Sequence, residues 1–263
     1  MTDLLAAYDA ELRGERELTG ALSATSVGPV WFGVFPGGTG FVGYRDLGDL
    51  DERGVRALVE DIAQRVAGDA GLHEAEWKTR AHDRAPGLLE ALAEAGFAAE
   101  ETESVMIGEA SGLVQDVPLP PGVTIRRVFA EHDVLAMEEM QGSVFGDPNW
   151  RVRATRTLDA LAAGADIELW VAEAGGTVIC AGRLEPVAGT RFAGLWGGAT
   201  RQEWRGRGIY RALTSRRARS ALERGARYLQ SDSTEFSRPI LERAGLRKVT
   251  ETTPYVWHRG DPA

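Results

Sequence analysis

Glycine and arginine alternate in the segment Arg205-Gly206-Arg207-Gly208-Ile209-Tyr210-Arg211, which follows a sequence typical of a strand and precedes a predicted helix. A loop of this kind at a helix N-terminus exposes backbone N–H groups that have no acceptor within the helix, and the helix dipole adds partial positive charge. The glycines leave the backbone open to an anion, and the arginines add full positive charges. The segment therefore predicts a binding site for a phosphate or pyrophosphate group.

A second pair of glycines, Gly197-Gly198, lies just upstream, inside the apolar strand predicted over Phe192–Thr200. Glycine weakens the interior of a strand, because it has no side chain to pack. Its presence there usually indicates a β-bulge or the close approach of another backbone. We therefore expect a bulge that separates this strand from the one predicted over Tyr228–Asp232.

The elements that position the loop can be predicted from residue 123 onward. A strand and two helices come first, followed by a hairpin that turns at Gly175-Gly176. The helix after the loop has an apolar side and stops at Gly225. A strand, a short helix and a closing strand that Pro254 interrupts complete this part. The predicted ranges are Val123–Val128, Glu131–Gln141, Trp150–Ala163, Ile167–Glu173, Val178–Pro186, Phe192–Thr200, Ile209–Arg224, Tyr228–Asp232, Ser237–Ala244 and Leu246–Trp257.

A proline cluster after Val117 predicts a linker over residues 117–122, between an N-terminal domain of residues 1–116 and a C-terminal domain of residues 123–263. The N-terminal domain resembles a partial copy of the C-terminal plan. It has a hairpin, a long helix for which Asp51 is the expected N-cap, and then a strand, a helix and a strand.

The N-terminal copy lacks the phosphate loop. Its long helix follows Gly48-Asp49-Leu50-Asp51-Glu52, which contains no Arg-Gly-x-Gly and whose carboxylates would repel a phosphate. The clearest internal match pairs Leu92-Ala93-Glu94-Ala95-Gly96-Phe97 with Leu241-Glu242-Arg243-Ala244-Gly245-Leu246. We therefore expect a degenerate copy and one phosphate site per chain.

Composition excludes several classes of protein. The net charge of −9 over 263 residues argues against a nucleic-acid surface, which needs a basic face. No apolar run is long enough to span a bilayer, and the N-terminus lacks the features of a signal peptide. Cys180 is the only cysteine, so no intrachain disulfide is expected, and its apolar strand context favours a packing role. These features, with an Arg-rich composition, indicate a cytoplasmic bacterial protein.

The loop and its context resemble the Gcn5-related N-acetyltransferases (the GNAT family). Arg205-Gly206-Arg207-Gly208-Ile209-Tyr210 resembles their acyl-CoA signature, Arg/Gln-x-x-Gly-x-Gly/Ala, and departs from it at Tyr210. The segment from Ser237 to Leu246 resembles their late helix followed by Gly-Phe. The resemblance implies an α/β (α+β) GNAT fold, with a mixed, mostly antiparallel twisted sheet flanked by helices, C-terminal to a degenerate GNAT-like domain.

The resemblance also implies acetyl-CoA as cosubstrate and no metal. The loop backbone would hold the CoA pyrophosphate, and the edge of Gly198-Ala199-Thr200 would bind the pantetheine arm in the slot beside the bulge. The implied reaction is direct transfer of the acetyl group from the thioester to a neutral primary amine of a small molecule, in a ternary complex. The residues expected to bind the cofactor are Gly198, Ala199, Thr200, Arg205, Gly206, Arg207, Gly208, Ile209, Tyr210, Arg211 and Ser237.

The groups that would move protons do not follow the family pattern. Many members use a Tyr of the late helix as the acid, and the matching residue here is Leu241, which cannot donate a proton. Asp232, at the end of its strand, is the nearest carboxylate that could act as base. Tyr255 or Ser237 could lie by the thiol. His82 and Asp83 are two residues only and do not make a metal site.

Other interpretations remain beside the enzyme. The absence of an acid at Leu241 also fits a non-catalytic acyl-CoA-binding sensor or interaction module. A dinucleotide-binding fold is set aside, because the third glycine of its fingerprint is missing. The arginines at 216, 217 and 219 are interpreted as surface residues, unlike those that flank the glycines.

Overall fold

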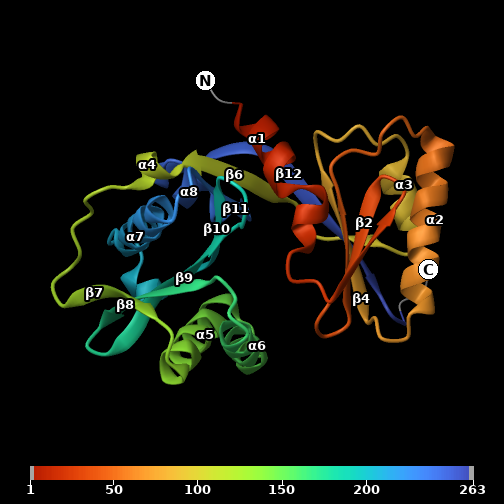
Figure 1. The fold of residues 1–263 in the computed structure, drawn as a ribbon. Helices are drawn as coiled ribbons and strands as arrows, with labels where there is room; N and C mark the ends of the chain where they lie inside the picture. The colour runs from red at the N-terminus through yellow and green to blue at the C-terminus, as the bar shows by residue number, and fades with distance from the viewer. Residues whose placement is uncertain (1–2, 261–263) are drawn as a thin grey trace. The chain divides into compact units, whose positions relative to one another are not determined.

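The computed structural model describes residues 3–260, which form two compact units (Figure 1). Unit 1 contains residues 3–105, 232–238 and 248–260, and unit 2 contains residues 106–231 and 239–247. These units differ from the domains expected from the proline cluster. The linker segment 117–122 lies inside unit 2, and most of the last strand lies in unit 1.

Unit 1 is a mixed sheet with helices on both faces. Its strand order is β1-β2-β3-β4-β12, with the short β5 beside β12. All neighbours are antiparallel except β3 and β4, which are parallel and joined through α2. The elements are α1 (Leu4–Leu12), η1 (Gly14–Leu18), β1 (Ser23–Val27), β2 (Val30–Phe35), β3 (Thr39–Tyr44), α2 (Glu52–Gly68), β4 (Glu74–Arg80), α3 (Leu88–Glu94), β5 (Ala98–Ala99) and β12 (Arg247–His258).

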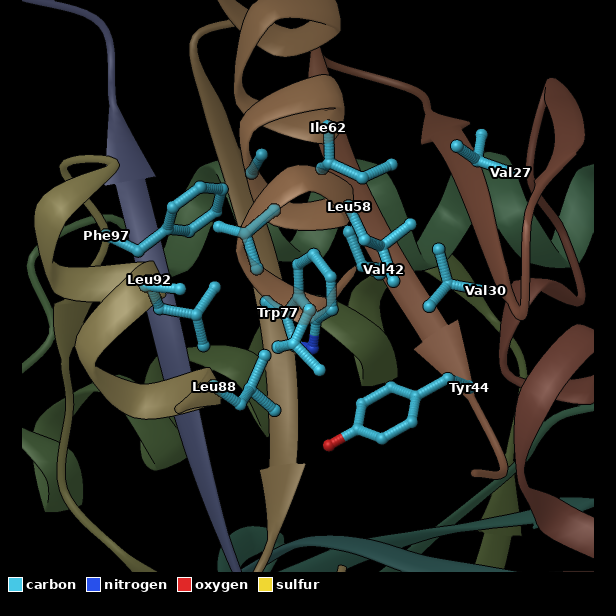
Figure 2. Close-up of a cluster of buried hydrophobic side chains, with 14 of the residues drawn as sticks. Val27, Val30, Val42, Tyr44, Leu58, Ile62, Trp77, Leu88, Leu92 and Phe97 are labelled. Carbon is cyan, nitrogen blue, oxygen red and sulfur yellow. The ribbon is translucent and has the colours of Figure 1, made fainter. Parts of the chain in front are cut away.

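The apolar core of unit 1 lies between the sheet and the helices α2 and α3. Buried residues of α2 recur at Val55, Val59, Ile62 and Val66, the spacing of one helix face. Trp77 of β4 lies among them and is fully buried (Figure 2). As predicted, Asp51 caps α2, since its side chain accepts a hydrogen bond from Gly54 N at 2.8 Å.

Unit 2 has the order β7-β8-β9-β10-β11. Its strands are antiparallel except for β10 and β11, which are parallel and joined through α7. One apolar cluster packs α5 against the sheet, and another packs α4, α7 and α8 against it. The elements are α4 (Ala110–Leu113), β7 (Val123–Val128), α5 (Glu131–Phe145), α6 (Trp150–Ala162), β8 (Glu168–Ala174), β9 (Thr177–Pro186), β10 (Phe192–Thr200), η2 (Gln202–Trp204), α7 (Ile209–Glu223) and α8 (Arg238–Ala244).

Three strands pass from one unit into the other along the chain, and one of them is β12, whose first residue lies in unit 2. β6 (Glu103–Glu109) begins in unit 1, and β11 (Tyr228–Ser233) begins in unit 2. The mixed, mostly antiparallel sheets with flanking helices confirm the predicted fold class.

The predicted interruption at Pro254 is wrong, because β12 continues through it. Pro254 lies opposite Lys78 of β4, and its carbonyl accepts a hydrogen bond from Glu100 N at 2.9 Å. The N–H and C=O groups of one strand residue point to the same side. The missing N–H of Pro254 therefore faces the short β5 side rather than the ladder with β4, which is where a strand tolerates proline.

Candidate functional site

The strands β10 and β11 pair at only three positions. Phe192, Ala193 and Gly194 of β10 lie opposite Tyr228, Leu229 and Gln230 of β11. Beyond Gly194 no further backbone register joins the two strands within residues 3–260, although Ser231 Oγ donates a hydrogen bond to Leu195 O at 2.8 Å. The two strands therefore separate in the direction of the glycine loop, as the sequence predicted.

The predicted bulge is present at Gly197-Gly198. Trp196 pairs with Arg183 of β9, and the next paired residue, Ala199, lies opposite Ala181, so two residues of β10 face one of β9. Gly197 has φ +60°, a conformation that favours glycine. The bulge is held from the other side of the sheet, because Gln141 Nε2 of α5 donates a hydrogen bond to Gly197 O.

The glycine loop leaves a row of backbone donors free. Gly206 and Gly208 have φ +75° and +77°, and α7 begins directly after them. The first hydrogen bond of the helix runs from Ala212 N to Gly208 O at 2.9 Å. The structure describes no protein acceptor for the backbone N–H groups of residues 206–211. These groups, at the positive end of the α7 dipole, form the anion site expected from the sequence.

The arginines of the loop keep their charges available. Arg205 Nε donates to Thr200 O at 3.1 Å, and Arg207 lies over the ring of Trp204 with 4.9 Å between its Cζ and the ring centroid. In the described part of the chain, neither of them forms an ion pair with a carboxylate, and neither does Arg211. All three are exposed. Trp204 thus anchors the loop, and the guanidinium groups remain free for an anion.

Tyr210, the departure from the family signature, points into the interior. Its ring packs in the apolar clusters beneath β10, and a Cβ built on Gly198 would lie 2.5 Å from its hydroxyl oxygen. Gly198 is therefore needed for packing as well as for the bulge. The side chain of Tyr210 consequently leaves the backbone N–H row uncovered.

The surface assignment of Arg217 is wrong, because its side chain is fully buried. It donates to Arg183 O at 3.0 Å and to Thr214 Oγ1 at 3.2 Å, and its Cζ lies 5.6 Å from the centroid of the Tyr210 ring. Arg216 and Arg219 are exposed, as predicted. The buried arginine therefore joins α7 to β9 beneath the sheet.

The residues predicted to move protons belong to unit 1, outside the unit that holds the loop. Asp232 Oδ2 accepts a hydrogen bond from Lys78 Nζ at 2.7 Å. Burial alone would lower the pKa of Lys78, but the charge of Asp232 and this hydrogen bond outweigh burial and raise that pKa. Tyr255 packs against the core of unit 1, and Ser237 Oγ donates to Thr234 O at 3.3 Å. Their catalytic and cofactor roles stay predictions.

Leu241 is 2% exposed and packs in the α7–α8 cluster of unit 2. It occupies the position of the usual acid and cannot donate a proton, as expected. Cys180 is fully buried, and this burial raises the pKa of its thiol to about 11. A thiol with this pKa is protonated at neutral pH, which agrees with a packing role.

Sequence analysis assigned no role to Gln141, which the structure places against the bulge. Gln141 and Glu138 lie on the buried face of α5, and Glu138 accepts a hydrogen bond from Thr157 at 3.0 Å. Polar residues at helical spacing among buried Val134 and Met137 were the available signal. Glu185 of β9 was also missed. It lies opposite Gly194, so it shares a sheet face with Trp196, and it pairs with Arg183 at 3.2 Å.

Within residues 3–260 no group of three or more His, Cys, Asp or Glu residues is arranged to hold a metal ion. No helix in the same range is long and apolar enough to cross a bilayer.

Comparisons with known proteins agree with this geometry. Residues 122–231 match the sequence model of the family described as Acetyltransferase (GNAT) domain. A GCN5-related N-acetyltransferase from Kribbella flavida aligns with a TM-score of 0.69 and 16% identity, over 94% of this chain and 94% of that one. A functionally unknown conserved protein from Staphylococcus epidermidis aligns with a TM-score of 0.68 and 13% identity, over 90% and 94%.

A tandem GNAT protein from the clavulanic acid biosynthesis pathway aligns with a TM-score of 0.65 and 13% identity, over 89% of this chain and 79% of that one. A search of curated proteins found no match. Because these sequence identities are low, the similarity to solved structures shows the fold alone. The family match over residues 122–231 includes the bulge and the glycine loop. Residues 122–231 therefore match a GNAT acetyltransferase domain, and the chain shares its fold with solved GNAT proteins.

Proposed function

We propose that this chain is an N-acetyltransferase that transfers an acetyl group from acetyl-CoA to a primary amine of a small molecule, by direct attack in a ternary complex. The observation that carries the proposal is the row of free backbone N–H groups over residues 206–211, at the start of α7 and next to the separated strands. This row fits a pyrophosphate group, because it offers several donors and no competing carboxylate.

The other residues of unit 2 support the fit. A Cβ at Gly206 would meet nothing within 4 Å, so the backbone is open there. Exposed Arg205, Arg207 and Arg211 surround the row with positive charge. Gly198 of the bulge, with Ala199 and Thr200 after it, lies on the strand that separates from β11, where an extended arm could bind by its backbone.

Acetyl-CoA would supply a thioester whose acetyl group passes to the amine as the C–N bond forms and the C–S bond breaks, leaving free CoA and an N-acetyl product. The backbone N–H groups of the bulge would donate to the negative charge that develops on the carbonyl oxygen. Asp232 remains the candidate base that removes the proton of the amine, and Tyr255 the candidate group by the thiol. The net charge of −9 agrees with a cationic amine substrate, and we place the protein in the cytoplasm.

The test is release of free thiol from acetyl-CoA across a panel of small amines. Gly208→Glu places a carboxylate in the N–H row and should abolish turnover. Gly225→Glu is the matched control, because Gly225 lies at the other end of α7 with φ +85° and open space around it. Both variants place a side chain at a residue with positive φ, so backbone strain is introduced in each. Turnover that survives in Gly208→Glu at the level of Gly225→Glu would contradict the proposal.

A non-catalytic acyl-CoA sensor is the second candidate, and buried Leu241 in place of the usual acid favours it. The same panel distinguishes the two functions. Tight binding of acetyl-CoA with no thiol release on any amine supports the sensor, whereas release with one or more amines supports the enzyme.

A further inference from the structure

A cavity of about 380 Å³ opens in unit 1 beyond the point where β3 and β4 stop pairing. Their register runs from Thr39 opposite Glu74 to Val42 opposite Trp77. The cavity is lined by Tyr44 at the end of β3 with residues 45–47 after it, by residues 82–84 after β4, and by residues of α1 with its C-cap Arg13. All of them belong to unit 1.

The carboxylates that line this cavity already have donors. Asp83 accepts hydrogen bonds from the Tyr44 hydroxyl at 2.5 Å and from Arg80 N at 3.0 Å, and it pairs with Arg13 Nη1 at 2.8 Å. Asp9 accepts from Arg13 Nη1 at 3.2 Å and lies 3.1 Å from His82 Nε2. The third carboxylate, that of residue 46, accepts from the backbone N–H two residues later at 3.0 Å.

In contrast to these carboxylates, several N–H donors of the cavity-lining arginines have no hydrogen-bond acceptor in the described part of the chain. The side chain of Arg13 is only 1% exposed, yet its Nε and Nη2 have no hydrogen-bond partner in the described part of the chain. Nε and Nη2 form one edge of the guanidinium group, the edge that binds two oxygen atoms of a carboxylate or phosphate. Arg45 and Arg84 are exposed, and the structure describes no ion pair or hydrogen bond for either side chain.

A buried guanidinium edge without acceptors costs free energy until something supplies them. The unmet hydrogen-bonding capacity of the lining is mainly that of donors, so the missing group is an acceptor with negative charge. We propose that this cavity binds a small oxyanion, a carboxylate or a phosphate, with Arg13 as its bidentate donor and Arg45 and Arg84 at its rim. The site is separate from the glycine loop and does not depend on the proposed acetyl transfer.

Solvent does not reach Nε or Nη2 of Arg13 in this conformation. The oxyanion therefore displaces a neighbour as it binds. We expect Asp9 to move, because its side chain is 25% exposed and its contact with Nη1 of Arg13 is the longer of the two ion pairs. At the N-terminus of α2, the carboxylate of Asp51 already accepts a hydrogen bond from Gly54 N, and its charge disfavours a phosphate there.

The experiment is calorimetric titration with succinate and with inorganic phosphate, in the Gly208→Glu background so that the loop of unit 2 does not contribute. We expect one site per chain, and the tighter probe tells a carboxylate ligand from a phosphate ligand. Arg13→Lys keeps the positive charge but removes the pair of N–H groups that binds two oxygen atoms. The affinity for the oxyanion should therefore fall about tenfold or more. Arg65→Lys, an exposed arginine of α2, is the matched control and should leave affinity unchanged.

Two results would overturn the site. One is the absence of binding by either probe at millimolar concentration, and the other is equal affinity in folded Arg13→Lys and Arg65→Lys proteins. If Arg13→Lys does not fold, Arg84→Gln carries the test, because that side chain is exposed and unpaired. It should weaken binding about threefold, and unchanged affinity would contradict the proposal.

Discussion

The crossover β3–α2–β4 in unit 1 and the crossover β10–α7–β11 in unit 2 share one plan. In each, two parallel strands pair over a few residues and then separate, and a long helix joins them. The N-terminus of α2 is capped by Asp51, whereas that of α7 begins at Gly208 without a side-chain cap. The same helix end is thus satisfied internally in one unit and left open for a ligand in the other.

The space beyond the paired part of β3 and β4 also differs from the space beyond the paired part of β10 and β11. In unit 1, Arg13, Tyr44 and Asp83 fill part of this space with a bonded network. In unit 2, the bulge at Gly197 and the loop contribute backbone groups instead of side chains. The crossover of unit 2 therefore leaves backbone donors free for an anion, whereas that of unit 1 satisfies them with a side chain.

The largest expected contrast is between two arginines. Arg13→Ala should destabilise unit 1 by about 3 kcal/mol, because it leaves the buried carboxylate of Asp83 without its ion partner. Arg207→Ala should change stability by less than about 0.5 kcal/mol, because Arg207 is exposed, but it should weaken acetyl-CoA binding. Urea denaturation of both variants measures these changes in the free energy of unfolding. Equal losses of stability would show that the two arginines do not differ in their structural roles.

A smaller effect is expected at the bulge. Gln141→Leu removes the hydrogen bond to Gly197 O and leaves that carbonyl unpaired, at a cost of about 1 kcal/mol. Because the bulge positions the strand edge, affinity for acetyl-CoA should fall about threefold to tenfold by calorimetry. Gln64→Leu, on an exposed position of α2, is the matched control. Unchanged affinity for acetyl-CoA in Gln141→Leu would show that this hydrogen bond to the bulge does not contribute to cofactor binding.

The smallest expected effect is at the cap of α2. Asp51→Ala should lower the free energy of unfolding by about 1 kcal/mol, since Gly54 N loses its acceptor. Asp49→Ala, an exposed neighbour for which no hydrogen bond is described, should have almost no effect. Removing the cap should not create acetyl-CoA binding in unit 1. A second acetyl-CoA site in Asp51→Ala would show that the cap alone accounts for the difference in binding between the two crossovers.

Local signals predicted the parts of this fold that depend on neighbours in sequence. The strand Phe192–Thr200, the bulge and the cap at Asp51 follow from apolar runs, paired glycines and capping chemistry, and the structure has all three. The contact of Gln141 with Gly197 joins residues 56 positions apart. The pair of Lys78 and Asp232 spans 154 positions. Such contacts have no local signature, because tertiary packing alone creates them.

The same limit explains Arg217 and Pro254. Arg217 belongs to an arginine-rich helix whose composition indicates a solvated face, yet it packs under Gly182 of β9 because glycine leaves room for its guanidinium there. Pro254 continues a strand because its missing donor faces the short β5. Both outcomes depend on which element lies alongside, and single-sequence patterns do not contain that information.

We propose that one crossover per chain, the one in unit 2, binds the cofactor. Titration of the whole chain with acetyl-CoA measures this directly. We expect one acetyl-CoA per chain, no binding in Gly208→Glu, and one site of unchanged affinity in Gly225→Glu. Two sites per chain, or a site of full affinity in Gly208→Glu, would show that the crossover of unit 2 is not the single cofactor site.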